Sequence, residues 1–96
     1  MDDRDAADVA KALSHPLRIA ILRAARARRK VSPSEYARET GEPLGNVSYH
    51  IQTLHQAGVL KVVDTAQRRG ALEHYYAVEG PRAGIVLAVL DMLEAA

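Results

Sequence analysis

Residues 44–58 read Leu44-Gly45-Asn46-Val47-Ser48-Tyr49-His50-Ile51-Gln52-Thr53-Leu54-His55-Gln56-Ala57-Gly58, and this stretch predicts the element around which the chain is organised. Its larger apolar side chains recur at steps of three and four residues, which gathers them into one stripe on an α-helix. They are Leu44, Val47, Ile51 and Leu54. We expect this stripe to be the buried side of a helix that ends near Gly58.

The opposite face of this predicted helix carries small or uncharged polar residues, and no charged residue occurs between Glu42 and Lys61. An ordinary solvated helix would be rich in Lys and Glu there. Amide and hydroxyl groups at helical spacing match the fixed donors and acceptors of base edges in the major groove of DNA. We therefore interpret this as a recognition helix; the alternative is a surface helix without a partner. The predicted base contacts are Gly45, Asn46, Tyr49, Gln52, Thr53 and Gln56.

The preceding residues predict another helix and a short turn. Ser32-Pro33-Ser34-Glu35 matches a capping box, in which the first serine caps the helix and the glutamate reaches back. This helix ends at Gly41, and Pro43 forces a turn. Residues 33–57 therefore predict a helix-turn-helix. The expected contacts to the DNA backbone around it are Ser32, Ser34, Ser48 and His50.

Two strand-like segments follow the predicted recognition helix. Residues 59–63 and 72–78 are rich in β-branched and aromatic residues, and the polar stretch between them ends in a glycine. They predict a β-hairpin over residues 59–78, which behind a helix-turn-helix is a wing. Arg68 and Arg69 at its tip are expected to contact phosphates or enter the minor groove. The alternative is a mobile, solvated loop.

The residues before the helix-turn-helix predict two further helices. An apolar period over residues 4–13 follows several aspartates, which suit a helix N-terminus. Pro16 begins a helix that is apolar around most of its circumference, so we expect it to be the central core helix. Its basic end, residues 25–30, fits either a solvated helix terminus or phosphate contacts. Val31 is a single strand residue or a connector. The pattern predicts a mainly α fold with one small antiparallel β-hairpin.

The tail from Arg82 to Ala96 predicts a helix with few polar positions besides Asp91 and Glu94. A helix that is apolar over most of its circumference needs burial on two sides. The domain itself covers one side, and a second copy of the chain supplies the other. We expect a homodimer joined through helices at residues 4–13 and 82–95; packing wholly within one subunit is the alternative. The expected interface residues are Val9, Leu13, Ile85, Val86, Val89, Leu90 and Leu93.

The length and composition of the chain indicate how many domains it forms and where the protein is found in the cell. A chain of 96 residues predicts a single domain, residues 1–96, and the absence of Cys, Phe and Trp leaves an aliphatic core with Tyr at its edges. Without Cys there is neither a disulfide framework nor a thiolate metal site. The net charge is only +1, although basic residues gather over residues 15–30. No signal-like or long apolar segment occurs, so we expect a soluble, cytoplasmic protein that does not bind membranes.

The residue pattern does not favour an enzyme. The histidines, His15, His50, His55 and His74, lie in separate contexts without metal-ligand spacing. Ser48 and His50 diverge on a helix because they are two residues apart, so they form no nucleophile and base pair. We therefore expect no catalysis, no cofactor and no metal. The main rival to DNA binding is a winged-helix domain that contacts another protein, which the near-neutral net charge favours.

Four segments in order, Lys11–Leu22, Asn46–Ile51, Leu54–Leu60 and Arg69–Tyr76, resemble the arsenic-repressor-like (ArsR/SmtB) winged helix-turn-helix regulators. The resemblance implies a dimeric bacterial or archaeal transcription factor, usually a repressor, with residues 44–57 in the major groove and residues 64–71 as the wing. The chain lacks the family's metal-sensing ligands, because residues 33–40 contain no Cys pair and no His follows His74. Any effector is then a small molecule, a protein or a change in pH.

Overall fold

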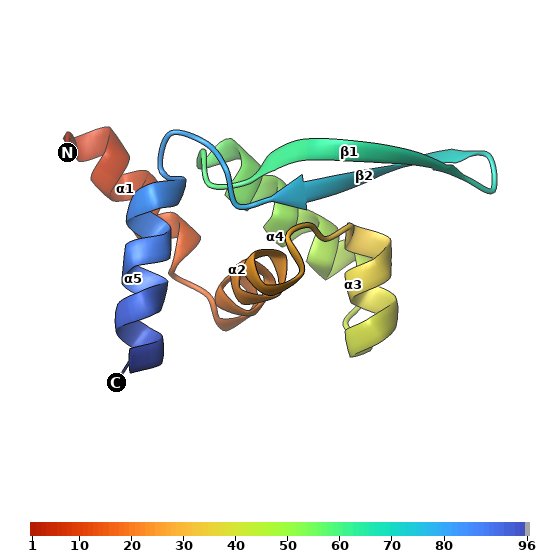
Figure 1. The fold of residues 1–96 in the computed structure, drawn as a ribbon, viewed down its shortest axis with the longest axis horizontal. Coiled ribbons are helices and arrows are strands. Elements are labelled where there is room, and N and C mark those ends of the chain that lie inside the picture. Colours follow the sequence, from red (N-terminus) through yellow and green to blue (C-terminus); the bar gives the residue numbers. More distant parts are fainter. Residues whose placement is uncertain (96) are drawn as a thin grey trace.

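The computed structural model describes residues 1–95, so the expected helical end at Ala96 lies outside the described residues. The described chain forms helices and one two-stranded sheet (Figure 1). This confirms the mainly α fold with a small antiparallel hairpin. The elements in order are α1 (Asp3–Ala12), α2 (Pro16–Arg28), α3 (Pro33–Thr40), α4 (Leu44–Gln56), β1 (Lys61–Arg68), β2 (Ala71–Ala77) and α5 (Ala83–Ala95).

Side-chain caps account for where the first three helices begin. The Asp2 carboxylate accepts from the Asp5 backbone N–H at 2.8 Å, so α1 begins earlier than the apolar period predicted. The ring Nδ1 of His15 accepts from the Leu17 N–H at 3.0 Å, and the Ser32 hydroxyl accepts from the Glu35 N–H at 3.1 Å. Gly41 ends α3 in the left-handed conformation at φ 79°, as predicted.

The core is aliphatic and lies between α2, α4 and the start of the hairpin, with α5 closing one end. Tyr36 and Tyr75 stand at its edges, as the composition predicts. Its largest fully buried apolar side chains are Ile21, Leu22, Val31, Val47, Ile51, Leu54, Val59, Leu60, Val86 and Leu90. The prediction that Leu44 belongs to the buried stripe is wrong. Leu44 is 51% exposed because the first residue of α4 lies beside a groove under the hairpin instead of over the core.

The paired strands of the hairpin are longer than the sequence suggested, with one shift of register between Val62 and Asp64. β1 and β2 pair antiparallel from Lys61 with Ala77 to Arg68 with Ala71, so the polar residues after position 63 are strand and not loop. A tight turn explains this, since Arg69 and Gly70 both have positive φ, at 48° and 82°, which suits the twist of a hairpin. Val31 adds a single bridge to Tyr76, with N–O distances of 2.8 and 2.9 Å, which confirms its reading as a one-residue strand.

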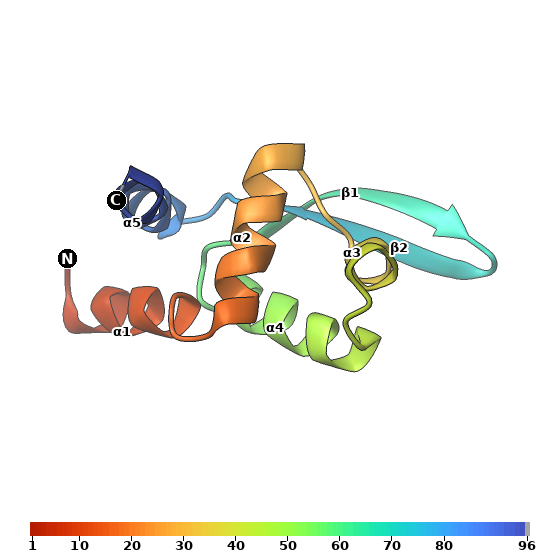
Figure 2. The ribbon, with the colours of Figure 1, turned by 90° about the horizontal axis from the view of Figure 1, so that it is seen from below.

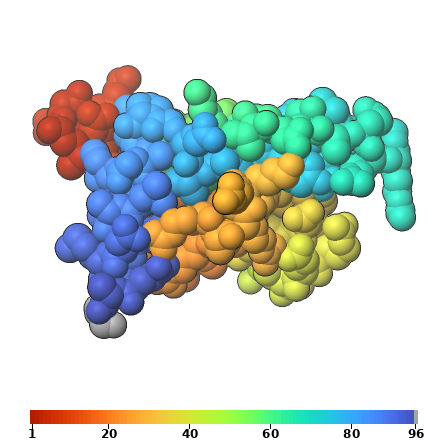
Figure 3. All heavy atoms as spheres, in the orientation of Figure 1, coloured from red at the N-terminus to blue at the C-terminus, as the bar shows by residue number. Residues whose placement is uncertain are grey.

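The two ends of the molecule have different roles in the architecture. Helices α1 and α5 lie side by side at one end, and the hairpin projects from the other (Figures 1 and 3). Arg82 joins α1 to the start of α5, because its Nε lies 2.9 Å from Asp5 and 3.2 Å from Asp8. No helix among residues 1–95 is long and apolar enough to cross a membrane.

The basic run at the end of α2 is mostly engaged within the subunit. Arg26 pairs with Asp91 at 2.7 Å and with Glu94 at 2.5 Å on α5. Arg28 pairs with Glu39 at 2.5 Å, and Lys30 pairs with Asp64 at 2.6 Å. Arg26 and Arg28 therefore join α2 to α5 and α3, and Lys30 joins the α2–α3 connection to β1. These pairs within the subunit favour a helix terminus that does not contact phosphates.

Candidate nucleic-acid interface

The outer face of α4 presents the polar residues that the sequence placed there. Asn46, Tyr49, Gln52 and Gln56 are exposed, Tyr49 at 63%, and Thr53 is half-buried. A side chain added at Gly45 would meet open space, so the backbone of the first turn is also accessible. The inner face holds Val47, Ile51 and Leu54 without exposure above about 1%, and this burial fixes the rotation of the helix. In Figure 2, α4 runs along one edge of the molecule, with α3 between it and the hairpin.

A buried arginine ties this helix to the rest of the subunit. Arg18 on α2 donates from Nε to His50 Nδ1 at 3.1 Å, from Nη1 to the Lys11 carbonyl at 2.7 Å and from Nη1 to the Ser14 hydroxyl at 3.1 Å. One guanidinium thus joins the end of α1, α2 and α4. The prediction that His50 contacts the DNA backbone does not fit, because the residue is only 9% exposed and its Nδ1 already accepts from Arg18. Sequence reasoning missed Arg18, although its helical spacing to Ile21, Leu22 and Ala25 places it on the buried face of α2 and was the available signal.

The Arg18 contact requires an unprotonated Nδ1 on His50. Burial lowers the pKa of His50, and His15 and Arg18 lower it further, while Glu42 acts in the opposite direction. His15 lies against it, with ring centroids 4.4 Å apart. The unfolded chain therefore binds this proton at higher pH than the folded chain does.

We expect the contribution of neutral His50 to the free energy of unfolding to be fully present above about pH 6.5, the ordinary pKa of histidine. This contribution should be lost as the pH falls through the lowered folded pKa of His50. Urea unfolding at about pH 7.5 and about pH 5.5 measures this loss. Replacing His50→Gln keeps an acceptor for Arg18 but removes the titration, so it should reduce the loss. The control His74→Gln, at an exposed position, should leave the loss of stability as large as in wild type. An equal pH dependence in wild type and His50→Gln would contradict this assignment.

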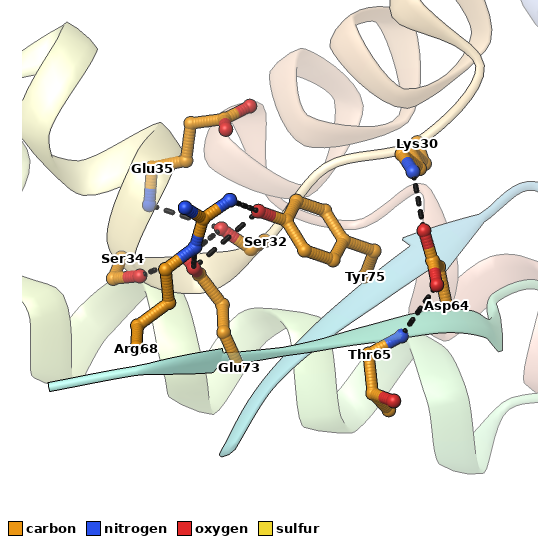
Figure 4. Close-up of polar contacts among 9 residues, drawn as sticks. All are labelled: Lys30, Ser32, Ser34, Glu35, Asp64, Thr65, Arg68, Glu73 and Tyr75. Atoms are coloured by element: carbon orange, nitrogen blue, oxygen red, sulfur yellow. Dashed lines mark hydrogen bonds and ion pairs between the residues drawn. The ribbon is translucent and has the colours of Figure 1, made fainter. Parts of the chain in front are cut away.

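A second polar cluster joins the hairpin to the start of α3 (Figure 4). The Ser32 hydroxyl donates to Glu73 Oε1 at 2.5 Å, and the Ser34 hydroxyl donates to the same oxygen. These bonds, led by that from Ser32, lower the pKa of Glu73, which is therefore ionised at neutral pH. Ser32 is fully buried, so its predicted backbone contact to DNA is wrong; its hydroxyl caps α3 and binds Glu73 instead. Ser34 is half-buried at the edge of the cluster.

A further ion pair fixes the base of the hairpin on its other strand. Lys30 Nζ lies 2.6 Å from Asp64 Oδ2 and 4.9 Å from the centre of the Tyr75 ring (Figure 4). The hydrogen bond from Lys30 lowers the pKa of Asp64, and the Thr65 backbone N–H adds to this effect. The hairpin is therefore held against α3 and the α2–α3 connection by one carboxylate on each strand.

The predicted wing cations differ in their surroundings. Arg69 occupies the exposed turn. Arg68 is also exposed, but its Nη2 donates to the Tyr75 hydroxyl at 3.2 Å and its Nε lies 3.2 Å from Glu73 Oε2. A groove runs from the hairpin to the first residue of α4, and its lining includes Leu44, Ser34, Arg68 and Leu72. This groove therefore lies between the hairpin, where the sequence predicted backbone contacts, and α4, where it predicted base contacts. Ser48 on α4, a predicted backbone contact, is exposed.

The predicted dimer residues fall into two groups. Val9, Val86 and Leu90 pack into the subunit's own core and present almost no surface to a partner, so their direct place in an interface is wrong. Leu13 and Val89 are half-buried. Ile85 and Leu93 are exposed at 39% and 47%. Met92, at 72%, extends this outer apolar face of α5, and sequence reasoning missed it because the helix pattern alone did not show which face points outward.

Comparison with known proteins places this arrangement in a family. A family model for a helix-turn-helix domain matches residues 13–63, more than half of the chain. This match spans α2, α3 and α4 and extends into β1. No curated protein sequence matches the chain significantly.

Solved structures with the same architecture are regulators. A homodimeric winged helix-turn-helix DNA-binding domain from Mycobacterium bovis, a possible ArsR-family transcriptional regulator, is 25% identical over 99% of this chain and 88% of that one, with a TM-score of 0.71. The transcriptional repressor PagR of Bacillus anthracis is 23% identical over 88% of this chain and 92% of that one, with a TM-score of 0.64. The chain therefore belongs to the helix-turn-helix domain family, and its fold is that of the winged helix-turn-helix regulators of the ArsR family.

Proposed function

We propose that the protein is a sequence-specific, double-stranded DNA-binding regulator that acts as a homodimer and represses transcription by occupying its operator. The observation that carries this proposal is the outer face of α4, where exposed amide and hydroxyl groups stand on a helix whose rotation is fixed by its buried side. A major groove admits one α-helix, and these side chains can pair with its base edges. Asn46 and Tyr49 lie on the exposed first turns, where recognition helices contact bases.

The backbone contacts in this proposal come from the hairpin, from the start of α3 and from Ser48 on α4. Arg69 at the turn and Arg68 beside the groove would approach phosphates, together with Ser48 and Ser34. Such contacts position the protein on the duplex without reading its sequence. The proposal therefore assigns base readout to the outer face of α4 and most of the sequence-independent attraction to the two hairpin arginines.

The dimer in this proposal uses the outer face of α5. Ile85, Val89, Met92 and Leu93 follow one another at helical spacing and remain wholly or partly exposed on the single subunit. The similar protein from Mycobacterium bovis is homodimeric, which supports the same assembly here. A two-fold dimer would present two copies of α4 to successive major grooves.

The proposal includes no metal-sensing role on α5. Asp91 and Glu94, the remaining candidate ligands on that helix, both pair with Arg26 of α2. The Arg26 guanidinium donates a hydrogen bond to each carboxylate, and Arg23 also pairs with Glu94 at 3.4 Å. A small molecule, a protein or a change in pH remains as the class of signal.

Selection of genomic DNA fragments by the purified chain tests the proposed function. We expect recovery of a short, two-fold related sequence, and affinity that falls steeply with rising salt because bound phosphates release counterions. Recovery without sequence preference, or no DNA binding at low salt, would contradict the proposal. The second outcome would favour a protein-binding winged helix, for which the exposed Leu44 and Leu72 in the groove would provide apolar contacts.

Variants on the two surfaces should separate base readout from backbone attraction. Asn46→Ala or Tyr49→Ala should lower affinity for the selected sequence by about 1–3 kcal/mol and change binding to unrelated duplexes little. Arg69→Ala should weaken binding to all duplexes alike and reduce the salt slope by about one contact. Fluorescence anisotropy with both kinds of duplex measures these effects. If Arg69→Ala altered sequence preference and Tyr49→Ala did not, the assignment of the reading surface would be wrong.

A further inference from the structure

The exposed Arg68 of the hairpin already has an anionic partner within the subunit, the carboxylate of Glu73. Its Nε lies 3.2 Å from Glu73 Oε2, and its Nη2 donates to the Tyr75 hydroxyl at 3.2 Å. The Tyr75 hydroxyl in turn lies 3.4 Å from Glu73 Oε2, which closes a three-membered cluster (Figure 4). The Arg68 side chain is 63% exposed, so a phosphate in the neighbouring groove can reach the same guanidinium.

Glu73 cannot easily leave this cluster. Its side chain is only 14% exposed, and its other oxygen, Oε1, accepts from the hydroxyls of Ser32 and Ser34. Ser32 is itself fully buried as the cap of α3, so the carboxylate is fastened to the helix-turn-helix. Hydrogen bonds of this kind favour the charged carboxylate. The hairpin therefore holds the negative charge of Glu73 beside Arg68, the cation that a DNA phosphate would bind.

We propose that Glu73 competes with DNA phosphates for Arg68 and thereby limits the sequence-independent affinity of the wing. This inference rests on the proposed DNA-binding function. A phosphate that approaches Arg68 must either displace Glu73 from the guanidinium or bind close to the negatively charged carboxylate, which repels it. In either case the ion pair between Arg68 and the phosphate contributes less to the free energy of binding. Limited backbone affinity makes the protein depend more on the base contacts of α4. Glu73 is in this sense a specificity-determining residue, although it lies where it would not touch a base.

Glu73 also has a structural role, because it attaches the hairpin to α3 through the two serines. The replacement Glu73→Gln separates the two roles. Glutamine keeps a carbonyl oxygen that can accept from Ser32 and Ser34, but it removes the negative charge beside Arg68. A purely structural role therefore predicts unchanged or weaker DNA binding, whereas competition for Arg68 predicts tighter binding.

The test measures binding to a labelled duplex of arbitrary sequence by fluorescence anisotropy over a series of salt concentrations. We expect Glu73→Gln to bind about two- to fivefold more tightly than wild type, the range that one exposed ion pair can supply, with a steeper salt dependence. Should Glu73→Gln fail to fold, Arg68→Gln tests the same point: competition predicts that it weakens binding to the duplex less than Arg69→Gln does, because Glu73 already pairs with the Arg68 guanidinium. Thermal unfolding identifies which variant is folded.

Two controls assign the effect to the Arg68 pair. Asp64→Asn makes the same change in net charge at the hairpin base, but Asp64 pairs with Lys30, so its effect should be smaller. In an Arg68→Gln background, Glu73→Gln should produce no tightening. An equal gain from Asp64→Asn, or a gain that persists without Arg68, would overturn the proposal because general charge would then explain it.

The outcomes also distinguish this inference from the function on which it rests. If wild type binds duplex DNA and Glu73→Gln binds no more tightly, the competition is refuted and the DNA-binding function stands. If neither wild type nor Glu73→Gln binds any duplex at low salt, both the function and the inference fail.

Discussion

Replacing Leu93→Glu is expected to convert the proposed homodimer into a monomer and to weaken binding to a two-half-site operator by about 100-fold or more. Leu93 is 47% exposed on the outer face of α5, beside Met92, and a carboxylate there would be buried without a partner in a dimer. The subunit itself should remain folded, because its core uses the opposite face of the helix, Val86 and Leu90. The loss in DNA affinity follows because two linked recognition helices bind with an effective concentration that a monomer lacks.

Light scattering measures the mass, and anisotropy with the selected operator measures the affinity. Leu72→Glu is the matched control for the mass, since this leucine is similarly exposed at 54% but lies on the hairpin. It should leave the dimer intact. A wild-type chain that is monomeric at micromolar concentration, or a Leu93→Glu variant that remains dimeric, would refute the assembly through α5.

Replacing Arg18→Ala is expected to lower the free energy of unfolding by about 2–4 kcal/mol, a large share of the total for a domain of this size. The change removes three hydrogen bonds from a charged donor group and leaves the Lys11 carbonyl and His50 Nδ1 without their partner. It also leaves a cavity between α1, α2 and α4. Since these bonds join the end of α1 to α4, amide exchange in α4 should rise as well.

Urea unfolding at one fixed protein concentration tests this expectation, because the stability of a dimer depends on concentration. Arg23→Ala is the control on the same helix, where the side chain is half-exposed and pairs with Glu94 at 3.4 Å. That change should cost less than about 1 kcal/mol. A similar loss from both variants would show that the Arg18 contacts contribute no more than an ordinary surface ion pair.

Much of the candidate site was predictable because it depends on local rules. The three- and four-residue spacing of Val47, Ile51 and Leu54 determined which face of α4 is buried, and the same spacing left Asn46 and Tyr49 outside. The cap at Ser32 and the stop at Gly41 set the bounds of α3 through backbone groups within a few residues. A helix period did not predict the exposure of Leu44, since that depends on how far the core extends beneath the first turn.

The sequence by itself determined the order of the elements, the buried face of the recognition helix and the composition of the core, because these follow from periodicity, capping and turn chemistry between near neighbours. Only the tertiary structure decided that Arg18 holds His50, that Glu73 holds Arg68, and which face of α5 remains open. Each of those contacts joins different secondary-structure elements, and the partners of a polar side chain across such a distance are set by packing, which no local pattern records.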